Sequence, residues 1–134
     1  RIYQSRDGQF RQISIDHVLG GGLFRKSPLT QFVGIPEEHM TLEPSIVREA
    51  SEEGIRYLIC SDGVTDMLTD GEIADILTRE IPVEETVEIL LDRALKKGGR
   101  DNATIVLCEV KKKKRYSLKG LLDRIMRRDG GDAG

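Results

Sequence analysis

Two apolar runs, each bordered by an aspartate, constrain this chain more than any other feature of its sequence. The run 56–61 is followed directly by Asp62 and Gly63, and the run 103–110 is preceded directly by Asp101 and Asn102. Short continuous apolar runs are typical of strands that are covered on both faces. If the two strands are antiparallel neighbours, the end of the first lies beside the start of the second. The sequence therefore predicts that Asp62 and Asp101 meet at one edge of a sheet.

Such a meeting of carboxylates favours a metal site. Two close carboxylates repel each other unless a proton or a cation lies between them, and Mg²⁺ and Mn²⁺ prefer oxygen ligands. Asp66, four residues after Asp62, is placed to return a third carboxylate. Gly63 allows a sharp turn and a close approach to a ligand, and the Asn102 side chain can tie its loop down. The alternative that these aspartates bind no metal stays open. Asp-Gly is a common turn, and Asp62, Asp66 and Asp70 have the spacing of a solvated helix face.

The rest of the body alternates between strand and helix patterns. A turn at 6–8 predicts a hairpin, and Thr69 followed by Glu72 has the pattern of a helix capping box. Pro44 confines its strand to an edge. The chain starts without Met in a strand pattern, so we expect it to continue a domain that begins upstream. The predicted elements are strands at 2–5, 9–15 and 42–48, and helices at about 69–80 and 83–97.

Charge divides the chain into an acidic body and a basic tail. Residues 1–110 contain 12 Lys and Arg against 20 Asp and Glu, whereas residues 111–134 contain 9 basic against 3 acidic residues. Apolar residues from 118 to 126 recur at helical spacing, which predicts a short amphipathic helix. This tail could pack on its own domain, lie on anionic lipid or dock on a partner. Nucleic acid is not expected as a partner, because no aromatic residue except Tyr116 interleaves with the basic ones.

Two long segments carry a family resemblance. Residues 58–68, LICSDGVTDML, and residues 98–107, GGRDNATIVL, closely resemble the last motifs of the protein phosphatase type 2C family, the metal-dependent serine/threonine phosphatases. The start of the chain and residues 29–34, LTQFVG, resemble the bacterial branch of that family in the same order. The resemblance covers residues 1–110 and leaves the tail unexplained. It implies an α+β fold, namely the C-terminal part of a four-layer α-β-β-α sandwich with antiparallel sheets.

The resemblance also implies roles for the aspartates. Asp62 and Asp101 match ligands of a binuclear Mn²⁺ or Mg²⁺ centre, and Asp66 matches a ligand of a third, more weakly bound ion. The implied reaction is hydrolysis of phosphoserine and phosphothreonine in proteins by metal-activated water, without a covalent phosphoenzyme. The family's remaining ligands, its phosphate-binding arginine and its general-acid histidine lie upstream in a full-length member. His17 and His39 do not match that histidine. Because half of the metal-binding residues are missing, we expect this chain alone to be inactive.

Other expectations follow from composition and from the resemblance. The alternative function is a phosphatase-like regulatory or binding module without catalysis, against which the intact aspartates argue. Phosphoproteins modified by a serine/threonine kinase are the expected substrates. A cytoplasmic location is expected, because no signal peptide or long apolar run is present. Cys60 and Cys108 lie in apolar runs and are expected to be buried, reduced side chains.

Overall fold

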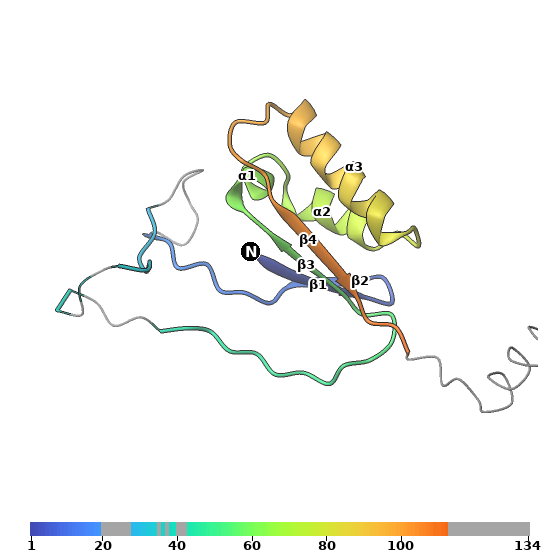
Figure 1. The fold of residues 1–134 in the computed structure, drawn as a ribbon, viewed down its shortest axis with the longest axis horizontal. Coiled ribbons are helices and arrows are strands. Elements are labelled where there is room, and N and C mark those ends of the chain that lie inside the picture. Colours follow the sequence, from blue (N-terminus) through green and yellow to red (C-terminus); the bar gives the residue numbers. More distant parts are fainter. Residues whose placement is uncertain (20–27, 35, 37, 40–42, 113–134) are drawn as a thin grey trace, which may run out of the picture.

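A computed structural model describes residues 1–19, 28–34, 36, 38–39 and 43–112 of the chain. Within these residues the chain forms one antiparallel sheet with helices on one side (Figure 1). The strand order is β2-β1-β3-β4, so the two apolar strands are antiparallel neighbours, as the sequence predicts. The elements are β1 (Ile2–Arg6), β2 (Gln9–Gln12), β3 (Arg56–Cys60), α1 (Asp62–Thr65), α2 (Asp70–Leu77), α3 (Val83–Lys96) and β4 (Ile105–Glu109).

The hairpin of β1 and β2 is confirmed, with a two-residue turn. Asp7 and Gly8 have φ angles of 48° and 75°, and two successive positive φ angles are what a tight hairpin turn requires. Gly adopts them without strain, and Asp is among the residues that tolerate them best. The second strand ends at Gln12 and is shorter than the predicted 9–15.

The sheet has one covered and one open face. Side chains that alternate toward the helices form the core, where Tyr3 and Leu58 are paired across β1 and β3 and fully buried. The opposite face, which we call the open face, carries the neighbouring pair Ile59 and Val106, exposed to 46% and 47%. The prediction that β3 and β4 are covered on both faces is therefore wrong for this chain. Cys60 is buried as expected, whereas Cys108 is exposed.

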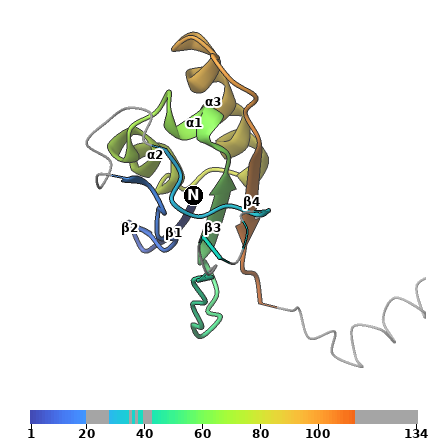
Figure 2. The ribbon, with the colours of Figure 1, turned by 90° about the vertical axis from the view of Figure 1, so that its left-hand side faces the viewer.

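The helices α1, α2 and α3 cover the other face (Figure 2). The capping box of α2 is confirmed, because the Thr69 side chain accepts a hydrogen bond from the Glu72 N–H and the Glu72 side chain accepts one from the Thr69 N–H. Together with the sheet the helices enclose an aliphatic core. Its buried members are Tyr3, Leu58, Cys60, Val64, Met67, Leu68, Ile73, Ile76, Leu77, Leu90 and Ala94.

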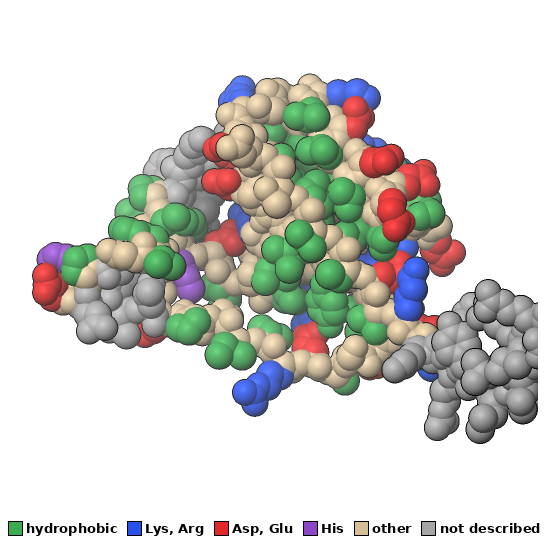
Figure 3. Space-filling model, viewed as in Figure 1, with side chains coloured by type: hydrophobic (Ala, Val, Ile, Leu, Met, Phe, Trp, Pro, Cys, Tyr) green, Lys and Arg blue, Asp and Glu red, His purple; other side chains and the backbone are tan. Residues whose placement is uncertain are grey.

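The connection from β2 to β3 is long and largely irregular in its described parts. It holds one bridge, between Val18 and Leu29, and hydrophobic side chains gather on it at the left of Figure 3. The strand predicted at 42–48 is wrong for residues 43–48, which lie in no strand. Pro44 removes one N–H from that stretch, and Ile46 and Val47 are exposed.

Residues 113–134 lie outside the described part, and so does the helix predicted at 118–126. Among the described residues, no helix is both long enough and apolar enough to cross a bilayer.

Candidate metal centre

The loops that follow β3 and precede β4 are in direct contact. The Ser61 N–H donates to the Thr104 carbonyl at 3.0 Å. The Ser61 hydroxyl donates to the Asn102 carbonyl at 3.1 Å and accepts from the Thr104 N–H at 2.9 Å. Three hydrogen bonds therefore join two segments that are more than forty residues apart. The prediction that these two loops meet at one edge of the sheet is confirmed.

Gly63 makes this contact possible. A Cβ atom at this position would lie 2.4 Å from the Asn102 carbonyl oxygen and 3.2 Å from the Ala103 Cα. Real Cβ contacts are essentially never shorter than 3.0 Å. The sequence suggested that Gly63 lets the backbone approach a ligand, whereas the structure shows that it lets the two loops pack backbone against backbone.

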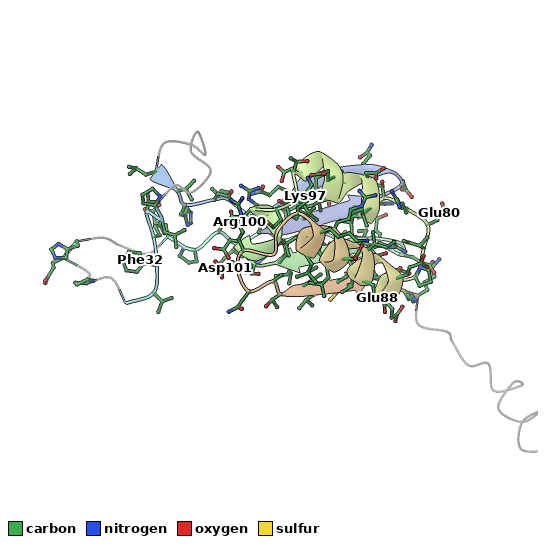
Figure 4. The ribbon with its side chains drawn as sticks, turned by 90° about the horizontal axis from the view of Figure 1, so that it is seen from above. Phe32, Glu80, Glu88, Lys97, Arg100 and Asp101 are labelled. Atoms are coloured by element: carbon green, nitrogen blue, oxygen red, sulfur yellow. The ribbon has the colours of Figure 1, made fainter. Side chains whose placement is uncertain are left out.

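Both predicted principal ligands belong to these loops. Asp62 is the first residue of α1, and Asp101 precedes β4 by a few residues; both are exposed. One oxygen of Asp101, Oδ1, accepts a hydrogen bond from the Asn102 N–H at 2.8 Å, which fixes the carboxylate on its own loop. The sequence suggested that the Asn102 side chain ties the loop down, whereas the hydrogen bonds of this loop are made by the Asn102 carbonyl and N–H. Figure 4 shows Asp101 at the end of the sheet where α1 begins, opposite to Glu80.

Asp66 lies at the other end of the short helix α1. It is the C-cap residue, half-buried, and its N–H donates to the Asp62 carbonyl at 2.7 Å. Within the described part of the chain, no three Asp, Glu, His or Cys side chains are grouped closely enough to hold a metal ion. The described residues thus bring together the loops of Asp62 and Asp101 but form no three-ligand cluster that includes Asp66.

The donor chemistry at this edge fits a hard divalent cation. Asp62 and Asp101 offer carboxylate oxygens, which Mg²⁺ and Mn²⁺ prefer. The nearby thiol of Cys60 is buried, and burial raises the pKa of that thiol. Thiols are softer ligands than carboxylates, so Asp62 and Asp101 are the better donors for these hard ions.

A polar cluster beside this edge was not predicted from the sequence. The Arg1 guanidinium donates to Asp16 at 2.7 Å and to Asp70 at 3.2 Å, and Asp70 also accepts from the Tyr3 hydroxyl at 2.7 Å. Burial raises the pKa of Tyr3, and the bond to Asp70 raises it further. No local pattern could have revealed a contact between residues 69 positions apart.

The bounds of the first two helices decide the alternative of a single solvated helix face. Because α1 ends at Thr65 and Asp70 begins α2, Asp62, Asp66 and Asp70 do not form one solvated helix face.

The two histidines take part in backbone contacts of the long connection. The carbonyl of His17 accepts a hydrogen bond from the Thr30 N–H, and the N–H of His39 donates to the Pro36 carbonyl.

No family model matches the chain, but individual proteins do. The serine/threonine protein phosphatase PstP of Mycobacterium tuberculosis is 32% identical over 121 residues, which cover 82% of this chain and 23% of PstP. Protein phosphatase PhpP of Streptococcus pneumoniae is 31% identical over 121 residues, covering 80% of this chain and 48% of PhpP. The chain thus spans at most about half the length of these curated relatives.

Solved structures agree with these relatives. The catalytic domain of the serine/threonine protein phosphatase PstP, in complex with two manganese ions, superposes with a TM-score of 0.64 at 36% identity. That match covers 84% of this chain and 50% of the solved one. A metal-bound structure of a similar protein is therefore available for the same part of the fold.

Proposed function

Because it matches these phosphatases in sequence and fold over about four fifths of its length, this chain belongs to the type 2C family of metal-dependent serine/threonine protein phosphatases, and we propose that it supplies half of one catalytic domain. In that domain Asp62 and Asp101 bind divalent metal ions, and the domain hydrolyses phosphoserine and phosphothreonine in proteins. The single observation that carries this proposal is the contact of the loops of residues 61–63 and 102–104, which brings both aspartates to one edge of the sheet.

The chain's own residues would hold the ions rather than react. Asp62 and Asp101 present oxygen ligands, and Asp66 is proposed to help with a third, weakly bound ion. When bound, Mn²⁺ or Mg²⁺ ions supply an acidified water and neutralise charge on the phosphoryl oxygens. Gly63 and Asn102 hold the two loops at a fixed separation.

The second half of the site is proposed to come from outside this chain. The open face and the absence of a three-ligand cluster among the described residues suit a domain of which residues 1–110 form the C-terminal half of a four-layer sandwich. The alternative, a phosphatase-like regulatory module without catalysis, is disfavoured by the presence of both aspartates in contacting loops. Phosphoproteins of a serine/threonine kinase remain the proposed substrates, in the cytoplasm. Docking through residues 111–134 stays a prediction.

Substitution of the two aspartates in the full-length protein tests this function. We expect Asp62→Asn and Asp101→Asn each to lower Mn²⁺-dependent dephosphorylation of a phosphothreonine peptide by at least about 100-fold, since each removes a charged metal ligand. Because both side chains are exposed, the free energy of unfolding should change little. Asp92→Asn, which removes an exposed carboxylate on α3 that pairs with Lys96, is the control. Full activity in either ligand variant would overturn the proposal.

The chain by itself provides a second test. We expect residues 1–134 alone to show no turnover of a chromogenic phosphate ester with Mn²⁺, because upstream ligands are needed to complete the metal site. The full-length protein, assayed in parallel, is the positive control. Turnover by the isolated chain at the rate of the full-length protein would contradict the division into two halves.

A further inference from the structure

The Ser61 hydroxyl occupies a place where the sheet would ordinarily use a backbone carbonyl. The β3–β4 ladder ends at the pair Cys60 and Ile105, and the next pair is Ser61 and Thr104. In a regular antiparallel ladder such a pair exchanges two N–H···O=C bonds. Only one of them forms, from the Ser61 N–H to the Thr104 carbonyl. The returning N–H of Thr104 instead donates to the Ser61 hydroxyl at 2.9 Å.

The start of α1 explains this exchange of acceptors. Ser61 is the N-cap of α1, and its carbonyl accepts from the Val64 N–H at 3.2 Å. A serine at this position ordinarily caps the helix with its side chain, yet the Ser61 side chain makes no capping bond. Its carbonyl thus accepts a hydrogen bond within the helix, and its hydroxyl accepts one from the neighbouring strand. The chain can therefore turn from strand into helix within one residue without leaving the Thr104 N–H unpaired.

The same hydroxyl reaches the second metal loop. Its own hydrogen is donated to the Asn102 carbonyl at 3.1 Å, next to Asp101. The residue on its other side along the chain is Asp62. Only a group that both donates and accepts can make these two bonds at once. Ser61 is therefore next to Asp62 in the chain and is hydrogen-bonded to the backbone of the loop that carries Asp101.

We infer that Ser61 is a positioning residue, which fixes the separation of Asp62 and Asp101 by hydrogen-bonding its hydroxyl across the two loops. This inference rests on the proposed metal-dependent function. Residues that orient metal ligands at one remove typically change metal affinity by about 10- to 100-fold when they are removed. Ser61 touches neither metal nor substrate in this role, and it acts through the geometry of the two loops.

Two measurements on the full-length protein test the inference. We expect Ser61→Ala to weaken Mn²⁺ binding by about 10-fold. Electron paramagnetic resonance of the free ion measures this binding. Amide hydrogen exchange at Thr104 should become at least several-fold faster, because its acceptor is gone. Ser61→Thr keeps the hydroxyl and should restore both readouts, and Ser51→Ala, at an exposed serine of the long connection, is the control.

The outcomes separate this inference from the function on which it rests. If the wild type binds Mn²⁺ and Ser61→Ala binds it equally well, the positioning role is wrong and the phosphatase assignment stands. If the wild type binds no Mn²⁺, the proposed function itself fails. Should Ser61→Ala not fold, exchange at Thr104 in the wild type still decides, since an amide that exchanges at the rate of an unpaired one has no hydroxyl acceptor.

Discussion

At the scale of single residues, the candidate site depends on small side chains as much as on charged ones. The loops of Asp62 and Asp101 approach so closely that only a glycine fits at position 63 of α1, against the Asn102 carbonyl. Because Gly63 packs against backbone atoms, no flexible side chain can move aside to make room for a Cβ atom. The close approach of the two loops therefore depends on the absence of a side chain at position 63.

Gly63→Ala should consequently separate the loops. The new methyl group would lie 2.4 Å from the Asn102 oxygen, and forced contacts of this kind cost about 1–3 kcal/mol of stability. We expect urea unfolding of the full-length protein to show that loss, together with weaker Mn²⁺ binding. Gly71→Ala is the matched control, because a Cβ there meets nothing within 4 Å and Ala favours the helix. Equal stability of the two variants would mean that the loops do not touch as described.

Part of the candidate site could be predicted from single residues. Aspartates at the ends of two apolar runs indicated where the loops meet, because strand pairing carries them there. The close packing of Gly63 against the Asn102 backbone was not predicted, since a sequence does not show which backbone lies opposite. The cluster of Arg1, Tyr3 and Asp70 could not be predicted at all, because tertiary packing alone brings these residues together.

At the scale of elements, the carboxylate of Glu72 helps to join two helices. Glu72 completes the capping box at the start of α2, and both of its oxygens also accept from the Lys97 ammonium at the end of α3, at 2.5 and 2.7 Å. Lys97 first, and then the Thr69 N–H and hydroxyl, lower the pKa of Glu72 to about 2 from an ordinary value of 4.5. The end of α3, from which the Asp101 loop departs, is in this way tied to α2.

This tie should make stability depend on pH in a defined window. Because the pKa of folded Glu72 lies below 4.5, its contribution is complete above about pH 4.5 and is lost as the pH falls toward about 2. Glu72→Gln retains a capping-box side chain but loses the ion pair. We expect it to be less stable than wild type at neutral pH and equally stable near pH 2, by urea unfolding.

The expected size of the stability difference follows from the exposure of the ion pair. The Glu72–Lys97 pair is partly solvated, so the difference should be modest and should shrink in high salt. Asp92→Asn removes an ion pair with Lys96 inside α3 and leaves the contact between helices intact. A difference between wild type and Glu72→Gln that stays constant from neutral to acid pH would contradict the assigned role of the charge.

Helix α2, helix α3 and the β1–β2 hairpin were predictable because their signals are local, namely the capping box at Thr69, the stop at Pro82 and the turn at Asp7-Gly8. Helix α1 was missed, because four residues give no periodicity and Asp62-Gly63 also has a turn sequence. The strand predicted at 42–48 did not form at 43–48, since a strand needs a neighbour that a local pattern cannot supply.

At the scale of the whole molecule, the described residues cover the sheet on one face only. Its open face carries Ile59 and Val106, nearly half exposed. It contacts the long connection where Glu49 hydrogen-bonds to Gln4 and pairs with Arg11. Continuous apolar runs are typical of strands buried on both sides. The sequences of β3 and β4 thus suit a more enclosed sheet than this chain builds, in keeping with a chain that spans half of its relatives.

The open face gives the strongest test of the four-layer sandwich. If the upstream half covers this face, Val106→Lys in the full-length protein places an unpaired charge in a core and should lower the free energy of unfolding by more than about 3 kcal/mol. Val33→Lys makes the same change at a side chain that is 93% exposed and should shift stability by no more than about 0.5 kcal/mol. Guanidinium unfolding of both variants measures the contrast. Equal, small effects would mean that the face of β3 and β4 is a solvent surface, and the upstream half would then have to complete the metal site without packing on this sheet.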